Sequence, residues 1–303
     1  MRVVTIKEMK EIETKTFNEY GLSEDFIIEN VGIAGAHFLI DLIKEQAHFD
    51  LQTAPAKAPA TPAFPTSCTS EFIFLIGRGN NGSDGLSIAR HLTNFGLRPR
   101  AFLVFPDGPF SPEARRQIDL AQKFGVKVTP LLEGEQLSSY FEISASNHIV
   151  IDAIFGTGTR FPLGERMREL FDLVNEHSQF TVSVDICSGV HADTGDIAGG
   201  AIRANITLAI GLPKPGHFLS EGGRYSGDTR ILTVGFPEQE LEKNGDLYTL
   251  DEQSVEKYCA IKRNAFAHKN TFGHTILIGG SFGLTGALSM GSMAAFGSGA
   301  GLV

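Results

Sequence analysis

A glycine-rich turn between a strand pattern and a helix pattern constrains the fold of this chain more than any other feature. The continuous apolar run Glu71–Ile76 is typical of a strand buried on both faces, and apolar residues recur at helical spacing over Leu86–Phe95. Between them, residues 77–85 read Gly-Arg-Gly-Asn-Asn-Gly-Ser-Asp-Gly. Such a turn places backbone N–H groups and the positive end of a helix dipole where a phosphate binds. Glycines serve a tight turn by geometry alone, so the polar residues inside this one favour a ligand site.

The turn does not match two common nucleotide-binding motifs. It lacks the Gly-Lys-Ser/Thr ending of an ATP-binding P-loop. Its glycine spacing differs from that of the dinucleotide fingerprint, and Asp107 only loosely supplies the ribose-binding acid that the fingerprint requires. An NAD-linked oxidoreductase is therefore not favoured.

Composition narrows the class of protein. The 303 residues suffice for one large α/β domain and part or all of another. A net charge of −9 disfavours general binding to nucleic acid or to an anionic membrane. Cys68, Cys187 and Cys259 are too few and too scattered for a disulfide framework or a zinc site, and they fit a reducing compartment.

The N-terminal half contains no targeting signal that we recognise. Its first residues lack the apolar core of a signal peptide. Residues 26–43 are apolar but are interrupted by polar residues, namely Glu29, Asn30, His37 and Asp41. We therefore expect no membrane span and a cytoplasmic protein.

Strand and helix patterns alternate along most of the chain. Residues 5–44 predict two helices broken near Gly21, and the Pro/Ala-rich stretch 51–70 predicts a surface insertion. The strands expected after the first are 100–105, 126–129, 147–152, 180–185, 206–210 and 231–234, with helices at 112–124 and 163–177. This alternation predicts a three-layer αβα, Rossmann-like domain with a mostly parallel sheet over residues 1–240.

Three polar clusters follow strands of the predicted sheet: residues 77–85, 152–159 and 185–190. In open parallel sheets, ligands bind outside the carboxyl ends of the strands. Each cluster alone is a weak signal, because an Asp that ends a strand is most often a cap or turn residue. Ser188 is not a probable nucleophile, since it lacks the G-x-S-x-G setting. The occurrence of all three at one sheet edge indicates a binding site.

Read together, the clusters closely resemble the NAD(P)H-hydrate epimerase family. Family patterns G-x-G-N-N-G-G-D-G, D-x-x-F-G-T-G and V-D-I-P-S-G-V-x-A-D-T-G correspond to residues 77–85, 152–158 and 184–195, and residues 211–216 resemble a further family segment. The resemblance covers residues 1–237 apart from the insertion. It implies interconversion of the R and S forms of hydrated NADH or NADPH, in which water has added at C6 of the dihydronicotinamide. A dehydratase domain or protein then restores the cofactor.

The resemblance also implies site residues. Those that would hold the substrate are Asn80, Asn81, Gly82, Ser83, Asp84, Gly156, Thr157, Gly158, Thr159, Arg160, Phe161, Pro162 and Asp185. Asn81, Asp152 and Ser188 would bind a potassium ion (K+), and oxygen ligands suit such a hard cation. Asp185 is the first candidate for the acid/base and Asp152 the second.

This sequence departs from the family pattern at two positions. Ser83 replaces a glycine, and its Cβ would oppose a positive φ. Cys187 replaces a proline, which loosens the backbone before Ser188. We expect both to be tolerated.

From about residue 250 the chain changes character. Phe272–Ser281 predicts a strand that enters a glycine turn, and Thr285–Ala287 opens a small-residue helix. His268–Gly273 resembles the His-Lys-Gly-Thr-Phe-Gly start of the ADP- or ATP-dependent NAD(P)H-hydrate dehydratase family. The resemblance implies that residues 250–303 are an incomplete, ribokinase-like piece of that domain, without dehydratase activity from this chain alone. The other interpretation is a strand and helix that complete the first domain.

A second functional hypothesis is a non-catalytic Rossmann-like module that dimerises or associates with nucleotide or RNA. The retained polar residues Asn81, Asp84, Asp152, Asp185 and Ser188 argue against it, as does the acidic charge. A homodimer is left open.

Overall fold

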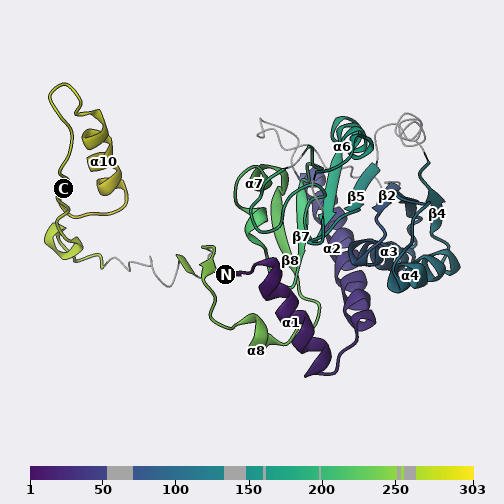
Figure 1. Cartoon of the computed structure of the whole chain (residues 1–303). Helices are drawn as coiled ribbons and strands as arrows, with labels where there is room; N and C mark the ends of the chain where they lie inside the picture. The colour runs from purple at the N-terminus through teal and green to yellow at the C-terminus, as the bar shows by residue number, and fades with distance from the viewer. Residues whose placement is uncertain (53–70, 133–147, 160–161, 198, 251–253, 256–263) are drawn as a thin grey trace. The chain divides into compact units, whose positions relative to one another are not determined.

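The computed structural model of the chain describes residues 1–52, 71–132, 148–159, 162–197, 199–250, 254–255 and 264–303, with the backbone alone for 45–52. These residues form two compact units, Met1–Thr249 and Leu250–Val303 (Figure 1). Most of the expected Pro/Ala insertion, residues 53–70, lies outside the described residues.

A seven-stranded parallel sheet is the centre of the first unit, in the order β4-β3-β2-β5-β6-β7-β8. Its strands are β2 (Glu71–Ile76), β3 (Arg100–Leu103), β4 (Lys127–Pro130), β5 (His148–Ala153), β6 (Phe180–Val184), β7 (Ile206–Ile210) and β8 (Asp228–Leu232). A separate antiparallel pair joins β1 (Arg2–Val3) to β9 (Leu247–Tyr248). The predicted parallel α/β sheet is confirmed.

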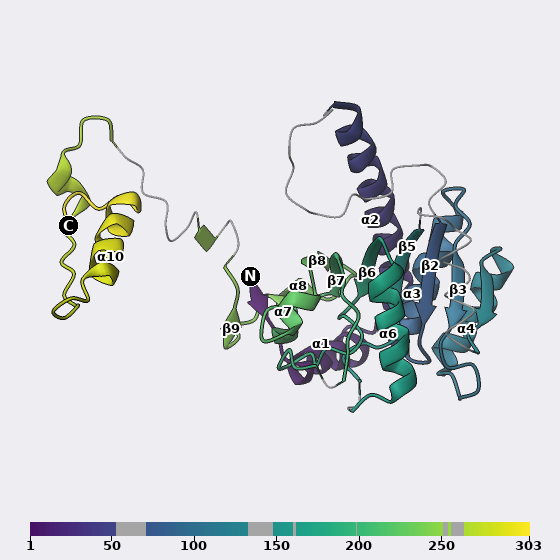
Figure 2. The same cartoon turned by 90° about the horizontal axis from the view of Figure 1, so that it is seen from above.

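Helices cover both faces of this sheet (Figure 2). They are α1 (Ile6–Asn18), α2 (Glu24–Gln52), α3 (Asn80–Thr93), α4 (Pro112–Lys123) and α6 (Glu165–His177), with the short η1 (Pro215–His217), α7 (Gly222–Tyr225) and α8 (Glu238–Leu241). Phe72, Phe74 and Ile76 of β2 pack with α1–α4, whereas Ile73 and Leu75 pack with α6. This alternation along one strand produces the three layers that the sequence predicts.

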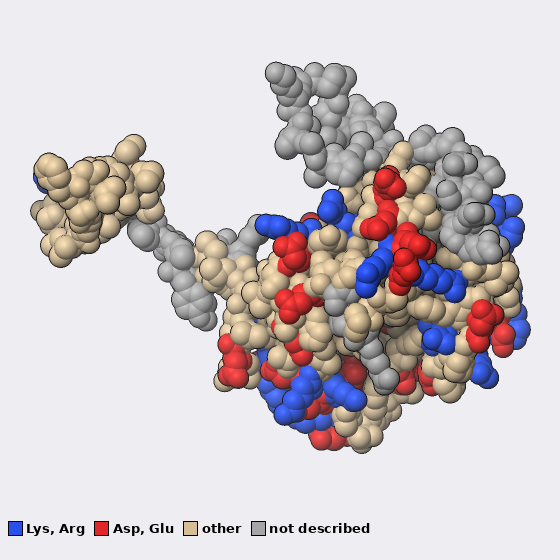
Figure 3. Space-filling model, turned by 45° about the horizontal axis from the view of Figure 1, so that its top comes forward, with Lys and Arg blue, Asp and Glu red and all other residues tan. Residues whose placement is uncertain are grey.

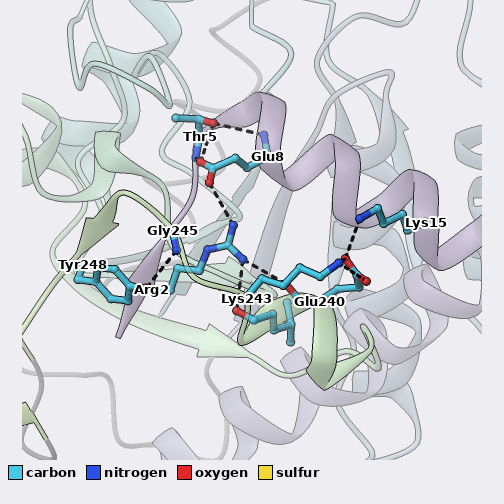
Figure 4. Close-up of polar contacts among 9 residues, drawn as sticks. Arg2, Thr5, Glu8, Lys15, Glu240, Lys243, Gly245 and Tyr248 are labelled. Atoms are coloured by element: carbon cyan, nitrogen blue, oxygen red, sulfur yellow. Dashed lines mark hydrogen bonds and ion pairs between the residues drawn. The ribbon is translucent and has the colours of Figure 1, made fainter.

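A cluster of polar contacts fastens α1 to the last part of the first unit (Figure 4). The Arg2 guanidinium donates to the Glu8 carboxylate at 3.1 Å and to the Glu240 carbonyl at 3.1 Å. The Glu240 carboxylate in turn accepts from Lys15 at 3.2 Å and from Lys243 at 2.5 Å. These contacts fix the position of α1 at the edge of the fold.

The expectation that no segment approaches a membrane span needs correction. Residues 24–44 of α2 form a helix that is long and apolar enough to cross a membrane by length and composition, and it lies near the N-terminus. The helix is nevertheless used in packing, because Glu29 pairs with Arg90 and His91 of α3 and Asn30 donates to the Val234 carbonyl at 2.9 Å. Its polar residues thus serve contacts within the first unit, as in a core helix.

Figure 3 shows acidic and basic side chains interspersed over one face of the molecule, without a broad basic field on the visible surface. This distribution agrees with the net charge of −9.

The second unit contains η2 (Lys269–Phe272) and α10 (Gly286–Gly297). The strand expected over Phe272–Ser281 is wrong, since the described residues there show only isolated bridges, His274 to Leu302 and Ser281 to Leu284. Ile276 and Ile278 are largely exposed, at 77% and 95%. A strand requires a neighbouring strand for its N–H and C=O groups, and the described residues of this unit supply none.

Candidate active site

A cavity of about 490 Å³ lies in the first unit where several strands end. Its walls come from α1, α2, the start of α3 and the segments after β2, β3, β5, β6 and β7. The predicted site residues that line it are Asn80, Asn81, Asp84, Gly156, Thr157, Gly158, Thr159 and Asp185. The three polar clusters therefore meet, as expected for the carboxyl edge of a parallel sheet.

Close packing positions the glycine-rich turn. Gly77 donates its N–H to the Ala153 carbonyl at 2.9 Å, and a Cβ on Gly77 would lie 1.8 Å from the Ile154 carbonyl oxygen. The helix α3 follows, with Gly79 as its N-cap and no side-chain hydrogen bond to the cap. Its first N–H groups are thus left for a ligand.

The concern over Ser83 is resolved by its position within α3. It is fully buried, has no positive φ, and its hydroxyl lies 3.4 Å from the Gly79 carbonyl. The turn ends before this residue, so the backbone at Ser83 is helical and its Cβ opposes no required positive φ. Gly82 is buried in the same helix.

Asp84 lies on the inner side of α3 and lines the cavity. Burial raises its pKa well above the ordinary value, and the charges of Asp185, Glu13 and Glu24 raise it further. Lys214 opposes this shift to a smaller extent. The surroundings therefore favour the protonated form of Asp84.

Asp185 occupies the first position after β6 in a left-handed conformation, with φ of 64°. Its Oδ1 accepts from Lys214 Nζ at 2.5 Å, and the same ammonium donates to the Ile210 carbonyl at 3.2 Å. Lys214 is only 1% exposed, so this ion pair lies at the base of the cavity.

The His217 ring contacts backbone groups of both residues of this ion pair. Its Nε2 lies 2.8 Å from the Asp185 carbonyl, and its Nδ1 accepts from the Lys214 N–H at 2.9 Å. Those roles require a neutral ring protonated at Nε2. Burial lowers the pKa of His217, and so does the charge of Lys214, which agrees with that neutral form.

Asp152 is fully buried behind the cavity wall and does not line it. Its carboxylate accepts from Ser183 Oγ at 2.8 Å, from Ser188 N at 2.8 Å and from Ser188 Oγ at 2.5 Å. Burial raises its pKa, while the hydrogen bonds from Ser188 and Ser183 lower it. This position suits a residue that orders β5, β6 and the Ser188 loop, and it favours Asp185 as the residue that meets a ligand.

The three predicted potassium ligands come together around Phe155. Ser188 Oγ accepts from the Phe155 N–H at 2.9 Å, and Asn81 Nδ2 donates to the Phe155 carbonyl at 2.8 Å. The Asn81 Oδ1 is buried and has no hydrogen-bond partner. An oxygen in that condition fits a cation ligand. No group of three or more His, Cys, Asp or Glu side chains suited to a metal occurs in the described part of the chain.

The segment after β5 lines the cavity through Phe155–Thr159. Gly156 is close to both neighbouring clusters, since a Cβ there would lie 3.3 Å from Asn81 Cβ and 3.4 Å from Asp185 Oδ2. The predicted substrate residues Arg160 and Phe161 lie outside the described residues, and Pro162 is exposed and does not line the cavity.

Sequence reasoning missed several residues that line the cavity, among them Met9, Glu13, Glu24, Arg78, Phe105 and Lys214. Glu13 lies on α1 one turn from Met9, and burial raises its pKa. Lys214 was within reach of the sequence analysis, because residues 211–216 had been recognised as similar to a family segment. Glu13 carried no signal beyond its helical spacing.

Cys187 is buried, and burial raises the pKa of its thiol to about 11. The thiol therefore stays protonated at neutral pH and is unreactive. Its Sγ lies 3.3 Å from Thr207 Oγ1 and 3.2 Å from the Tyr225 carbonyl, which anchor it away from the cavity.

Comparisons with known proteins agree on one family. Residues 24–216 match the sequence model of the family described as YjeF-related protein N-terminus. The chain is 30% identical over 303 residues to the bifunctional NAD(P)H-hydrate repair enzyme Nnr of Moorella thermoacetica, covering 100% of this chain and 53% of that protein. It is 28% identical over 232 residues to the NAD(P)H-hydrate epimerase of Weissella koreensis, covering 77% of this chain and 90% of that protein.

The chain spans about half the length of the bifunctional relatives it matches. Among solved structures, the yeast protein YNL200c has a similar fold, with a TM-score of 0.54 and 22% identity over 76% of this chain and 87% of that one. That likeness supports the αβα architecture.

Proposed function

The chain belongs to the family of YjeF-related protein N-termini, and we propose on that premise that it interconverts the R and S forms of hydrated NADH and NADPH. The name of the Weissella koreensis relative, which spans nearly the same region, supports this activity. The observation that carries the proposal is the Asp185–Lys214 ion pair at the base of a cavity that the α3 N-terminus also lines.

The reaction needs proton transfer at the hydroxyl of C6. Inversion there breaks the C–O bond next to the ring nitrogen and reforms it on the other face, so a proton must reach the departing oxygen and leave the incoming water. The nitrogen lone pair compensates the electron deficiency at C6 while that bond is broken. A cavity carboxylate that can meet the ring is sufficient for this chemistry.

Asp84 and Asp185 divide these roles by their surroundings. Asp185 lines the cavity beside the Lys214 ammonium, and we assign it the role of proton acceptor. Asp84 is held toward its protonated form by burial and by neighbouring acids, which suits a proton donor. Two carboxyl groups with opposed surroundings are the usual basis of an acid–base pair.

The substrate phosphates would meet the N–H groups at the start of α3. The absence of a side-chain cap on Gly79 leaves those donors free of a competing acceptor. Thr157 and Thr159 approach from the segment after β5.

A potassium ion would be held by Asn81, Asp152 and Ser188 together with the Phe155 carbonyl. The support is the buried, unpartnered Asn81 Oδ1 beside that carbonyl. When bound, the ion would supply positive charge that offsets the substrate phosphates. Epimerisation in potassium-containing buffer should exceed that in buffer with a large organic cation, and identical rates would remove the ion from the proposal.

We propose that residues 250–303 belong to the beginning of a dehydratase domain, and the match to a bifunctional repair enzyme over the whole of this chain supports that proposal. We also propose a cytoplasmic location, which the few and scattered cysteines support. A dehydratase that accepts one form of the hydrate is the partner this activity requires.

A coupled assay tests the proposal. A dehydratase that accepts one form restores only that fraction of a mixed hydrate, as followed by the near-ultraviolet absorbance of the dihydronicotinamide. Addition of this chain should carry the conversion to completion, and addition of Asp185→Asn should not. A plateau that stays unchanged with the wild-type chain would contradict the proposed function.

A further inference from the structure

Arg78 is a cavity residue that neither the family pattern nor the acid–base chemistry uses. It occupies the variable second position of the glycine-rich turn and lines the cavity. Its guanidinium carbon lies 5.0 Å from the centre of the Phe105 ring, which in turn packs against Phe155 at 5.6 Å between centres. Stacking on an aromatic face holds a guanidinium plane in one orientation and leaves its edge for a ligand.

The loop after β3 is shaped around this side chain. Ser111 donates its N–H to the Arg78 carbonyl at 3.0 Å. A Cβ on Gly108 would lie 1.4 Å from Nη1 of Arg78, so the missing side chain leaves the space that the guanidinium occupies. The cation is thus positioned before any ligand arrives, which lowers the entropic cost of binding.

The charged residues of the cavity leave the Arg78 guanidinium able to bind an anion. The described lining residues include four acidic side chains, those of Glu13, Glu24, Asp84 and Asp185, and two cations, Lys214 and Arg78. Lys214 is committed to Asp185 and to a carbonyl. Among the described residues, Arg78 forms no ion pair with a carboxylate, so its N–H donors are available to an anion.

Its place along the sheet edge indicates which part of a ligand it meets. Arg78 follows β2 and Phe105 follows β3, whereas Asp185 follows β6. β2 and β6 are separated by β5 alone, a distance of about 10 Å at the usual strand spacing. A nicotinamide ring at Asp185 would extend its ribose and phosphates toward β2 and then β3.

We propose that Arg78, held by Phe105 and Gly108, forms an anion subsite that binds a phosphate group of the dinucleotide beyond the start of α3. This assignment rests on the proposed function and extends it to the phosphate-bearing end of the substrate. The phosphate is either the diphosphate shared by both cofactors or the 2′-phosphate of the NADPH form, and the guanidinium fork fits either.

Calorimetric binding of NADP+ and NAD+ to the full chain tests the subsite independently of turnover. Arg78→Ala should weaken binding by about 10–100-fold, the range for one hydrogen bond to a charged group. Arg78→Lys should recover part of the loss. Gly108→Ala keeps the charge but displaces the guanidinium, and should weaken binding several-fold. Lys123→Ala, at the far end of α4, is the matched control for loss of one surface charge.

Comparison of the affinity losses for NADP+ and NAD+ identifies the phosphate that Arg78 binds. Equal losses for NADP+ and NAD+ assign Arg78 to the diphosphate, and a loss confined to NADP+ assigns it to the 2′-phosphate. With the hydrates as substrates, the same variant should raise KM with little change in kcat. Unchanged affinity for both nucleotides in Arg78→Ala overturns the subsite. Failure of the proposed function would look different, since the wild-type chain would then leave R and S hydrates unexchanged while nucleotide binding still depended on Arg78.

Discussion

The two units of the chain differ in how far their apolar side chains are buried. In α3 of the first unit, Leu86, Ile88 and Leu92 are fully buried against the sheet. In α10 of the second unit no side chain is buried, and Met290 and Met293 are 67% and 74% exposed. The sequence of α10 is the more apolar of the two, yet α10 is the exposed helix.

Composition alone does not decide burial. A helix becomes a core element where a sheet or a second helix covers its apolar stripe. The first unit offers seven paired strands for this purpose, whereas the described residues of the second unit form no strand beyond isolated bridges. We expect substitutions in the first unit to have large effects and changes in the second unit to have small ones.

The largest effect should come from Asp185→Asn. The amide keeps the shape of the carboxyl group but cannot exchange a proton, so the epimerisation rate should fall by about 10²–10⁴-fold. The measurement is the first-order rate of R to S exchange, with Asp119→Asn on the exposed face of α4 as the control. A rate near that of the wild type would move the acid/base role to another residue.

Asp152→Ala should reduce stability most among the site variants. It leaves Ser183 Oγ, Ser188 N and Ser188 Oγ without their acceptor inside the fold. Each unsatisfied buried donor costs about 1–3 kcal/mol, and removal of a buried carboxylate offsets part of that, so we expect a net loss of about 2–4 kcal/mol. Urea unfolding measures it. An unchanged midpoint would show that Asp152 does not order this region.

Asp84→Asn should raise stability while it reduces activity. Burial and neighbouring acids raise the pKa of Asp84. The folded protein then retains a proton that the unfolded chain releases near pH 4, and stability is lost as pH rises from there toward the folded-state pKa. The asparagine variant does not titrate and escapes this loss, so its stability advantage over the wild type should grow as pH rises. Melting curves across that interval check the sign, and a variant less stable at neutral pH would contradict it.

The smallest effect should follow deletion of residues 250–303. The first unit retains its sheet, its cavity and the pairing of β1 with β9. Its melting temperature should change by no more than about 2 °C, since about 1 kcal/mol corresponds to 2–4 °C in a domain of this size. Loss of folding or of R to S exchange in the shortened chain would show that the second unit supports the first.

The sequence predicted the sheet and the meeting of its three polar clusters because both follow from local patterns. Alternating strands and helices predict parallel strands, and the carboxyl ends of parallel strands share one edge. The clusters at residues 77–85, 152–159 and 185–190 could therefore be placed together before any coordinates were known. Arg160 and Phe161 lie outside the described residues, so their predicted role stays a prediction.

Contacts between distant segments could not be predicted in the same way. Lys214 reaches Asp185 across 29 residues, and nothing in its local pattern specifies a buried ion pair. Glu13 belongs to an ordinary amphipathic helix whose orientation depends on the polar cluster of Arg2 and Glu240. The start of β8 was also misplaced, since its pairing with β7 begins at Asp228 rather than at the apolar run from Ile231.

Exchange between the separated R and S hydrates, without added ATP or ADP, tests the central claim most directly. Samples of each pure form should reach the same R/S ratio in the presence of the full chain, at a rate far above that of buffer alone and proportional to protein concentration. Chromatographic separation of the two forms over time provides the measurement. Two samples that remain at their starting composition, or that change no faster than in buffer, would contradict the account.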